Sequence, residues 1–202
     1  MPDLPQANGA KVKMHDNIVE NNNHENFAPK GTVVATLPPG SGFTIMAHKE
    51  VEIYNNTVKN HKTVGMSISS WLITGTPYKS EEFDPYSHAV HVYDNVIADN
   101  KGPSDTSTDL GKLVSAMTQG QGTDIMIDGI FKPGTLGEDG LPTGSERICL
   151  RNNGDVRFVN LNAGMGATPE EMMQNRSTDM TPFDCSLEAI ELTDLNQLIS
   201  ER

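Results

Sequence analysis

Three segments of the chain decide its fold: Val12-Lys-Met-His-Asp-Asn17, Val51-Glu-Ile-Tyr-Asn-Asn56 and Val90-His-Val-Tyr-Asp-Asn95. Each begins 39 residues after the one before it. Within each segment apolar and polar residues alternate up to a final asparagine, and this period of two is typical of a strand with one buried face. The alternation predicts solvent exposure for Glu52. It predicts burial for Val51, Ile53, Val58, Ile68, Val90 and Val92.

A strand that recurs at a fixed spacing indicates a coiled, repetitive architecture. Further apolar runs at residues 31–36, 42–47 and 65–70 bring the unit to about three short strands. Asparagine tolerates left-handed backbone, and stacked asparagines can bond along an axis, so Asn17, Asn56 and Asn95 are expected at one corner of successive coils. This pattern predicts an all-β, right-handed parallel β-helix. The alternative is an antiparallel sandwich in which the spacing is coincidental.

The repeat pattern of the sequence changes after residue 100. Residues 1–100 are expected to form coils with the 39-residue repeat at positions 12, 51 and 90, and residues 101–202 the final degenerate coils and a short, helix-containing C-terminal cap. Strands are predicted near 124–128, 147–153 and 155–161. An amphipathic helix is predicted over 109–117 with Thr108 or Asp109 as N-cap, and another helix from 168. Residues 187–202 are also amphipathic.

Composition excludes several classes of protein. The 202 residues carry 27 acidic and 15 basic side chains, a net charge of −12, which argues against nucleic acid and anionic membranes as partners. No apolar run approaches the ~20 residues of a membrane span. The first residues lack the apolar stretch of a signal peptide, which taken alone predicts a cytoplasmic protein.

The repeat resembles that of the pectate-lyase-like superfamily of right-handed β-helices. More narrowly, Asn26-Phe-Ala-Pro-Lys-Gly31, Pro38-Pro-Gly-Ser-Gly42 and Phe83-Asp-Pro-Tyr86 resemble a family of exported bacterial β-helix proteins with no assigned activity. That family usually occurs with a second exported protein. The resemblance implies export to the periplasm or cell surface, and an exported partner.

Two cysteines, Cys149 and Cys185, have neither a CxxC spacing nor a nearby histidine, so a zinc site is not expected. Export, as the resemblance implies it, would allow them to form a disulfide that joins the cap to the last coil. The alternative is two buried free thiols.

The candidate site is Phe83-Asp-Pro-Tyr-Ser-His88, which follows a long loop over 72–82. Long loops on β-helices often form the binding face. Asp84, Tyr86 and His88 are the candidate catalytic acid and base groups, and Trp71, Tyr78, Glu81 and Glu82 the candidate ligand-binding residues, because aromatics beside carboxylates suit sugars. The segment faintly resembles the Asp-Pro-His-Glu element of β-helix alginate epimerases, with Tyr86 and Ser87 in place of His and Glu. The alternative is that Pro85 and Tyr86 only shape a turn.

Metal sites have weaker support. Two outward rows are expected, His15/Tyr54/Tyr93 and Lys13/Glu52/His91, but outward strand positions are usually solvated, so no transition metal is predicted. No cofactor is expected. The acidic, asparagine-rich turns at 16–17, 20–23 and 94–95 leave calcium open.

Two functions remain. The favoured one is a non-catalytic exported protein that binds a partner protein or a glycan, because the charge of −12 and the absence of arginine before residue 101 do not suit an enzyme on anionic uronate polymers. The alternative is a polysaccharide lyase, epimerase or hydrolase with its site around Trp71–His88. In addition, a chain that starts inside a coil would leave the strand at 12–17 as an edge, either covered by residues 1–11 or used for self-association.

Overall fold

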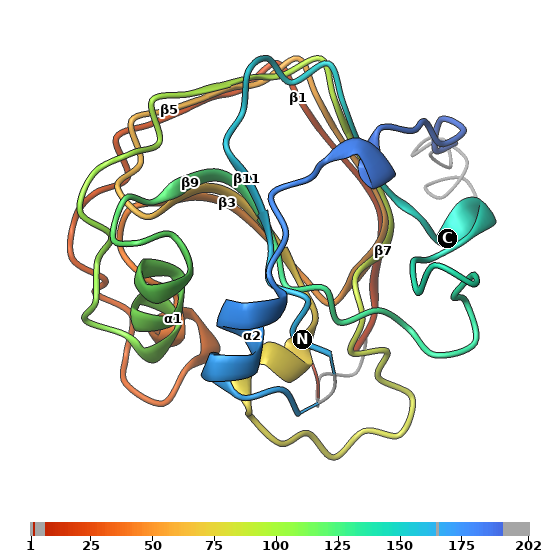
Figure 1. The fold of residues 1–202 in the computed structure, drawn as a ribbon, viewed down its shortest axis with the longest axis horizontal. Helices are drawn as coiled ribbons and strands as arrows, with labels where there is room; N and C mark the ends of the chain where they lie inside the picture. The colour runs from red at the N-terminus through yellow and green to blue at the C-terminus, as the bar shows by residue number, and fades with distance from the viewer. Residues whose placement is uncertain (1, 3–6, 165, 192–202) are drawn as a thin grey trace, which may run out of the picture.

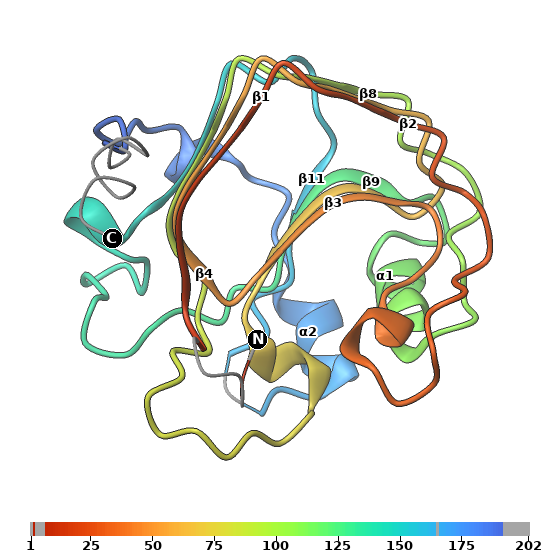
Figure 2. The ribbon, with the colours of Figure 1, turned by 180° about the vertical axis from the view of Figure 1, so that it is seen from behind.

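The computed structural model describes residues 2, 7–164 and 166–191, and its strands lie in three parallel sheets (Figures 1 and 2). The first sheet holds β1 (Gly9–His15), β4 (His48–Tyr54), β7 (His88–Tyr93) and β10 (Ile148–Arg151). The second holds β2 (Ile18–Glu20), β5 (Thr57–Lys59) and β8 (Val96–Ala98). The third holds β3 (Ser41–Met46), β6 (Val64–Ser69), β9 (Thr123–Ile127) and β11 (Phe158–Asn160).

Helices are few and lie outside the sheets. They are α1 (Asp109–Met117), α2 (Pro169–Asn175) and the short 3-10 helices η1 (Val33–Thr36), η2 (Trp71–Thr74), η3 (Gly144–Glu146) and η4 (Thr181–Phe183). Both α-helices begin as the sequence indicates. The Thr108 side chain accepts from Gly111 N at the start of α1, and Thr168 forms a capping box with Glu171 at the start of α2.

The register of the first sheet confirms the alignment of the repeat. Val51 pairs with both Val12 and Val90, and Val90 pairs in turn with Ile148. The six positions predicted to be buried are each at most 2% exposed. β9, β10 and β11 extend the same sheets, so the coils continue beyond residue 100.

Stacked asparagines line one corner, as expected. Asn17 donates through Nδ2 to Asn56 Oδ1 (2.9 Å), Asn56 to Asn95 Oδ1 (3.0 Å), and Asn95 to Asn153 Oδ1 (2.9 Å). The left-handed residue of each corner is the one before the ladder asparagine. It is Asp16, Asn55, Asp94 or Asn152, with φ between 51° and 56°. At each corner, therefore, the left-handed residue turns the backbone, and the asparagine after it bonds neighbouring coils together.

One predicted strand is wrong. Residues 31–36 form η1 and its lead-in, and the third short strand of each unit is the one that follows the ladder asparagine, as in β2 and β5. The cause is local: the Thr32 hydroxyl accepts from Ala35 N and caps a helical turn, and the prolines at 38 and 39 follow at once. The segment lies in a loop, where strand pairing does not compete.

The C-terminal segment closes one end of the coils. Ser177 pairs with Asn160 in an antiparallel bridge, and Phe183, 3% exposed, packs on Phe158 at a ring separation of 5.4 Å. Figure 1 shows this segment running across the end of the sheets from α2 to the first sheet. There Cys185 is joined to Cys149 by a disulfide, with the Cα atoms 4.9 Å apart.

The prediction that Glu52 is exposed is wrong. Residues 186–191, called here the C-terminal strap, lie over the outer face of the first sheet. Ile190 N donates to Glu52 Oε1 (2.7 Å), while Lys13 Nζ lies 3.0 Å from Oε2. Glu52 is consequently 2% exposed although it points away from the core.

Two expectations fall partly beyond the described residues. Of the expected cover over 1–11, residues 1 and 3–6 are not described, and the described residues 9–11 belong to β1 itself. Of the amphipathic stretch 187–202, only 187–191 is described, and it forms part of the C-terminal strap.

A second polar ladder inside the coils contains a fully buried histidine. His61 N donates to Asn100 Oδ1 (3.1 Å), and His61 Nε2 lies 3.1 Å from Val19 O, a contact that requires a proton on Nε2. Asn22 N donates to Nδ1 (3.4 Å), so that nitrogen is unprotonated. The ring is therefore held neutral between two coils.

Acid should destabilise the fold through this histidine. Burial lowers the pKa of His61 below 6.5, although the bond to Val19 and the charge of Glu20 oppose the effect. The folded chain thus binds fewer protons than the unfolded one, so stability present above the unfolded pKa is lost as the pH falls through the folded pKa. We expect the urea midpoint to drop between about pH 7.5 and about pH 5. His61→Asn, which copies Asn22 and Asn100, should flatten that dependence; an unchanged slope would assign it to other groups.

Candidate functional site

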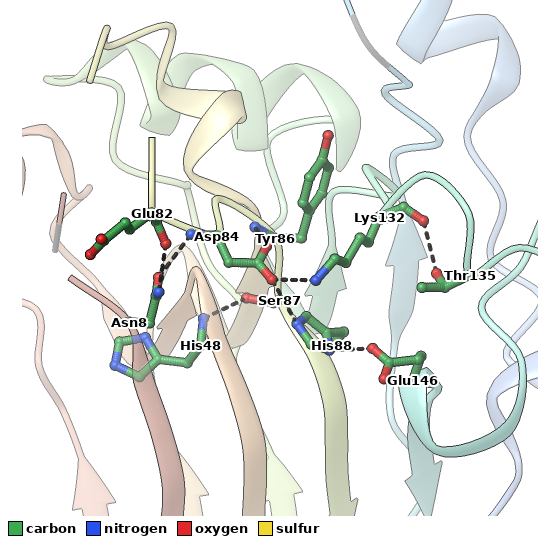
Figure 3. Close-up of polar contacts among 10 residues, drawn as sticks. All are labelled: Asn8, His48, Glu82, Asp84, Tyr86, Ser87, His88, Lys132, Thr135 and Glu146. Atoms are coloured by element: carbon green, nitrogen blue, oxygen red, sulfur yellow. Dashed lines mark hydrogen bonds and ion pairs between the residues drawn. The ribbon is translucent and has the colours of Figure 1, made fainter. Parts of the chain in front are cut away.

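The candidate catalytic residues lie where the chain enters the first sheet at β7. Asp84 lies in the loop between η2 and β7, four residues before His88, the first residue of β7. Asn8 braces this loop, since its Nδ2 donates to Glu82 O (2.7 Å) and its Oδ1 accepts from Asp84 N (2.8 Å). Tyr86 N donates to Asp84 Oδ1 (3.2 Å), which closes a tight turn at Pro85. Figure 3 shows these contacts.

Asp84 and His88 meet two residues from later in the chain. His88 Nε2 lies 3.2 Å from Asp84 Oδ2, and His88 Nδ1 lies 2.5 Å from Glu146 Oε2 at the end of η3. Lys132 Nζ contacts Asp84 Oδ2 at 2.5 Å. Both ring nitrogens of His88 therefore face carboxylates, and Asp84 has the amino group of Lys132 beside it. We call these four side chains the charged cluster.

The electrostatics of the charged cluster lower the pKa of Asp84. Burial acts to raise the pKa of Asp84, but hydrogen bonds from Lys132 Nζ and Tyr86 N, with the charges of Lys132 and His88, bring it below its usual value. A general acid or base works best with a pKa near the operating pH. The carboxylate of Asp84 is therefore stabilised as an ion and weakened as a base.

Tyr86 does not join the charged cluster. Its ring points away from His88 in Figure 3 and packs against the buried cluster that includes Ile130 and Leu161. Burial, followed by the neighbouring Tyr78 and Asp84, raises the pKa of the Tyr86 phenol. A phenol that serves as a base needs the opposite change. The sequence grouped Asp84, Tyr86 and His88, and the structure brings together only Asp84 and His88.

The candidate ligand-binding residues also lie apart from one another: the aromatic residues pack together, and the glutamates are exposed on the loop. Trp71 is 6% exposed, donates from Nε1 to Thr76 O (2.8 Å), and meets Phe83 edge to face at 5.9 Å. Tyr78 packs edge to face on the same Phe83 ring at 5.1 Å. Trp71 and Phe83 line a cavity of about 160 Å³, which is small for a sugar. Glu81 and Glu82 are exposed on the loop.

Sequence reasoning missed Lys132 and Glu146. Lys132 follows β9, 48 residues after Asp84, and Glu146 precedes β10. Neither belongs to a motif, and each reaches the cluster only because the coils stack. No signal in the sequence alone pointed to them.

The outward rows are ordered as predicted. His15, Tyr54 and Tyr93 stack with ring separations of 4.8 and 5.1 Å along the coils. Within the described ranges, no group of three or more His, Cys, Asp or Glu side chains is placed to hold a metal ion. The question of calcium at the acidic, asparagine-rich turns is not decided by this arrangement.

Comparison with known proteins adds no assignment. No family model, no curated protein and no solved structure matches the chain. No helix within the described part of the chain is long and apolar enough to cross a membrane. The function must therefore be argued from the chemistry of the residues themselves.

Proposed function

We propose that this chain is a right-handed parallel β-helix of an exported protein that binds a partner protein or a glycan and catalyses no reaction. Three in-register parallel sheets and two stacked polar ladders support the β-helix. The disulfide between Cys149 and Cys185 supports export, because disulfides persist chiefly in oxidising compartments. A right-handed crossover is also the ordinary hand for parallel strands.

The closed charged cluster is the observation that carries the non-catalytic assignment. A catalytic histidine needs a ring nitrogen available to substrate, whereas both nitrogens of His88 face carboxylates and its side chain is 8% exposed. The cluster ties the loop before β7 to the segments that precede β10. We interpret it as a structural joint that shapes this surface.

A protein is the favoured partner. Phe27 is 97% exposed and Ile18 is 77% exposed, both in the first coil, and exposed apolar side chains of this size suit a protein interface better than a hydrated sugar. The net charge of −12 also disfavours anionic polysaccharides. The first coil is therefore the surface that we expect to bind.

The binding test uses two purified proteins. A protein is captured from the exported fraction of the source cells, purified, and titrated with the purified chain in calorimetry. It is accepted as the partner only if it binds and if Phe27→Ser weakens that binding about tenfold. Val96→Ser, which removes a 52%-exposed side chain from another coil, is the matched control. Binding of a neutral glycan, with no effect of Phe27→Ser, would assign the second partner class.

The contact between Asp84 and His88 favours one alternative, a polysaccharide-active enzyme with its site around Trp71–His88. The two functions separate in an assay of polysaccharide cleavage and epimerisation. We expect no turnover by the wild-type chain. Turnover that Asp84→Asn abolishes and Glu25→Gln, an exposed change outside this site, leaves intact would overturn the non-catalytic proposal.

Self-association is part of the same proposal. Among the described strands, β1, β2 and β3 each pair on one side only, and such edges favour pairing with another chain. We expect sedimentation velocity across a concentration series to show a dimer that forms as concentration rises. A monomer at every concentration would remove self-association from the proposal.

A further inference from the structure

A cavity lies between the outer face of the first sheet and the C-terminal strap. Its volume is about 560 Å³, within the range of small-molecule sites. The strap forms its roof, Glu50, Glu52 and His91 contribute to its floor, and Ser145 lies at its side. Disulfide-linked Cys149 holds the start of the strap, where Arg151 Nη1 also donates to Ser186 Oγ (3.0 Å).

The strap buries groups that the strand pattern would leave in water. His91 is 8% exposed although it points outward, and its Nε2 has no hydrogen-bond partner. Leaving such a group buried and unbonded costs about 1–3 kcal/mol, and native proteins usually satisfy it with a protein group or a bound molecule. The unpartnered nitrogen of His91 thus indicates a missing hydrogen-bonding molecule.

The remaining groups define the chemistry of that molecule. Among the described residues that line the cavity, four are glutamates, Glu50, Glu52, Glu188 and Glu191, and one is a lysine, Lys11. Glu52 Oε1 already accepts from Ile190 N, whereas Glu52 Oε2 lies 3.0 Å from Lys13 Nζ and has no hydrogen-bond partner. The other carboxylates accept hydrogen bonds and donate none, and a neutral imidazole nitrogen also accepts. A suitable ligand must therefore donate hydrogen bonds and carry positive charge.

We propose that this cavity binds a small organic ammonium compound, held by Glu50, Glu188 and His91 Nε2 beneath the C-terminal strap. Burial lowers the pKa of His91 and Arg151 acts in the same direction, whereas Glu52 and Asp94 oppose it, so the shift favours the neutral ring, which accepts at Nε2 when its proton is on Nδ1. The site is distinct from the charged cluster and from the surface of the first coil. It follows from the cavity and its unpartnered nitrogen, independently of the proposed function.

Calorimetry with cadaverine tests the proposal, with pentanediol as an uncharged ligand of the same length. We expect cadaverine to bind at millimolar concentration or below and pentanediol not to bind. The double variant Glu50→Gln/Glu188→Gln should weaken binding by about thirtyfold or more, since two carboxylates are lost. Glu25→Gln, an exposed change on another loop, should leave it unchanged. Equal urea midpoints would show that the variants are folded.

Several results would overturn the proposal. One is the absence of cadaverine binding, and another is equal binding by the wild type and the double variant. A third is equal binding of cadaverine and pentanediol, which would indicate that charge does not matter. The variant Cys149→Ser/Cys185→Ser tests the roof separately: it should bind more weakly because the strap is released. Unchanged binding by a variant whose Ile190 amide exchanges fast would place the ligand outside the cavity.

Discussion

Replacing Asn95 with alanine is expected to lower the free energy of unfolding by at least about 4 kcal/mol, the largest effect of any single substitution that we predict. Asn95 is 3% exposed. Its Oδ1 accepts from Asn56 N and Nδ2, and its Nδ2 donates to Ile53 O, Tyr93 O and Asn153 Oδ1, all at 2.9–3.0 Å. Alanine removes every one of these bonds and leaves several buried partners without replacement.

Position along the ladder provides the control. Asn17 belongs to the same ladder but is exposed at its end, so water can replace its bonds, and Asn17→Ala should cost about 1 kcal/mol. Urea denaturation followed by circular dichroism measures both variants. If they cost the same, the ladder would act as a set of local turns, and the argument that it joins the coils would be wrong.

Removing the disulfide is expected to have the second largest effect. Cys149 and Cys185 are 36 residues apart, and a cross-link over a loop of that length stabilises by about 4 kcal/mol through the entropy of the unfolded chain. Cys149→Ala/Cys185→Ala should therefore lose about that amount in urea denaturation. The wild-type chain treated with a reductant should behave like the double variant.

The same variant has a local signature. The amide of Ile190 donates to Glu52 across the C-terminal strap, so its hydrogen exchange should be slow in the wild type and fast once the strap is released. The amide of Ile53, in the buried strand β4, serves as the control and should remain protected. Slow exchange at Ile190 in the variant would show that the strap docks without the disulfide.

The repeat in the sequence predicts the core and the corners because both depend on local pattern. Val51 and Ile53 face inward because strand side chains alternate, and the next coil repeats the pattern with Val90 and Val92. Asn56 is correctly placed for the same reason, since residues at one repeat position stack. The pattern wrongly predicts a strand at 33–36. There the Thr32 hydroxyl caps a helical turn, and this local bond prevails over the strand preference of the β-branched residues because no strand lies alongside.

The candidate site was only half visible in the sequence. Asp84 and His88 lie four residues apart, so a single turn at Pro85 brings them together. Lys132 and Glu146 reach them from other coils and decide the chemistry: Lys132 helps to lower the pKa of Asp84, and Glu146 lies against the second ring nitrogen of His88. The sequence alone therefore indicates an acid and base pair at Asp84 and His88, whereas the folded chain encloses this pair in the charged cluster.

The sequence by itself determined the parallel strands, the asparagine ladder and the two capped helices, since each follows from side chains at short or regular spacing. Only the tertiary structure decided which outward residues are covered. Glu52 and His91 follow the pattern of solvated positions, yet the C-terminal strap buries both and encloses a cavity against them. Ile190, which donates to Glu52, lies 138 residues away in the sequence. Strand periodicity predicts which face of the sheet a side chain points to, whereas its burial depends on which later segment folds over that face.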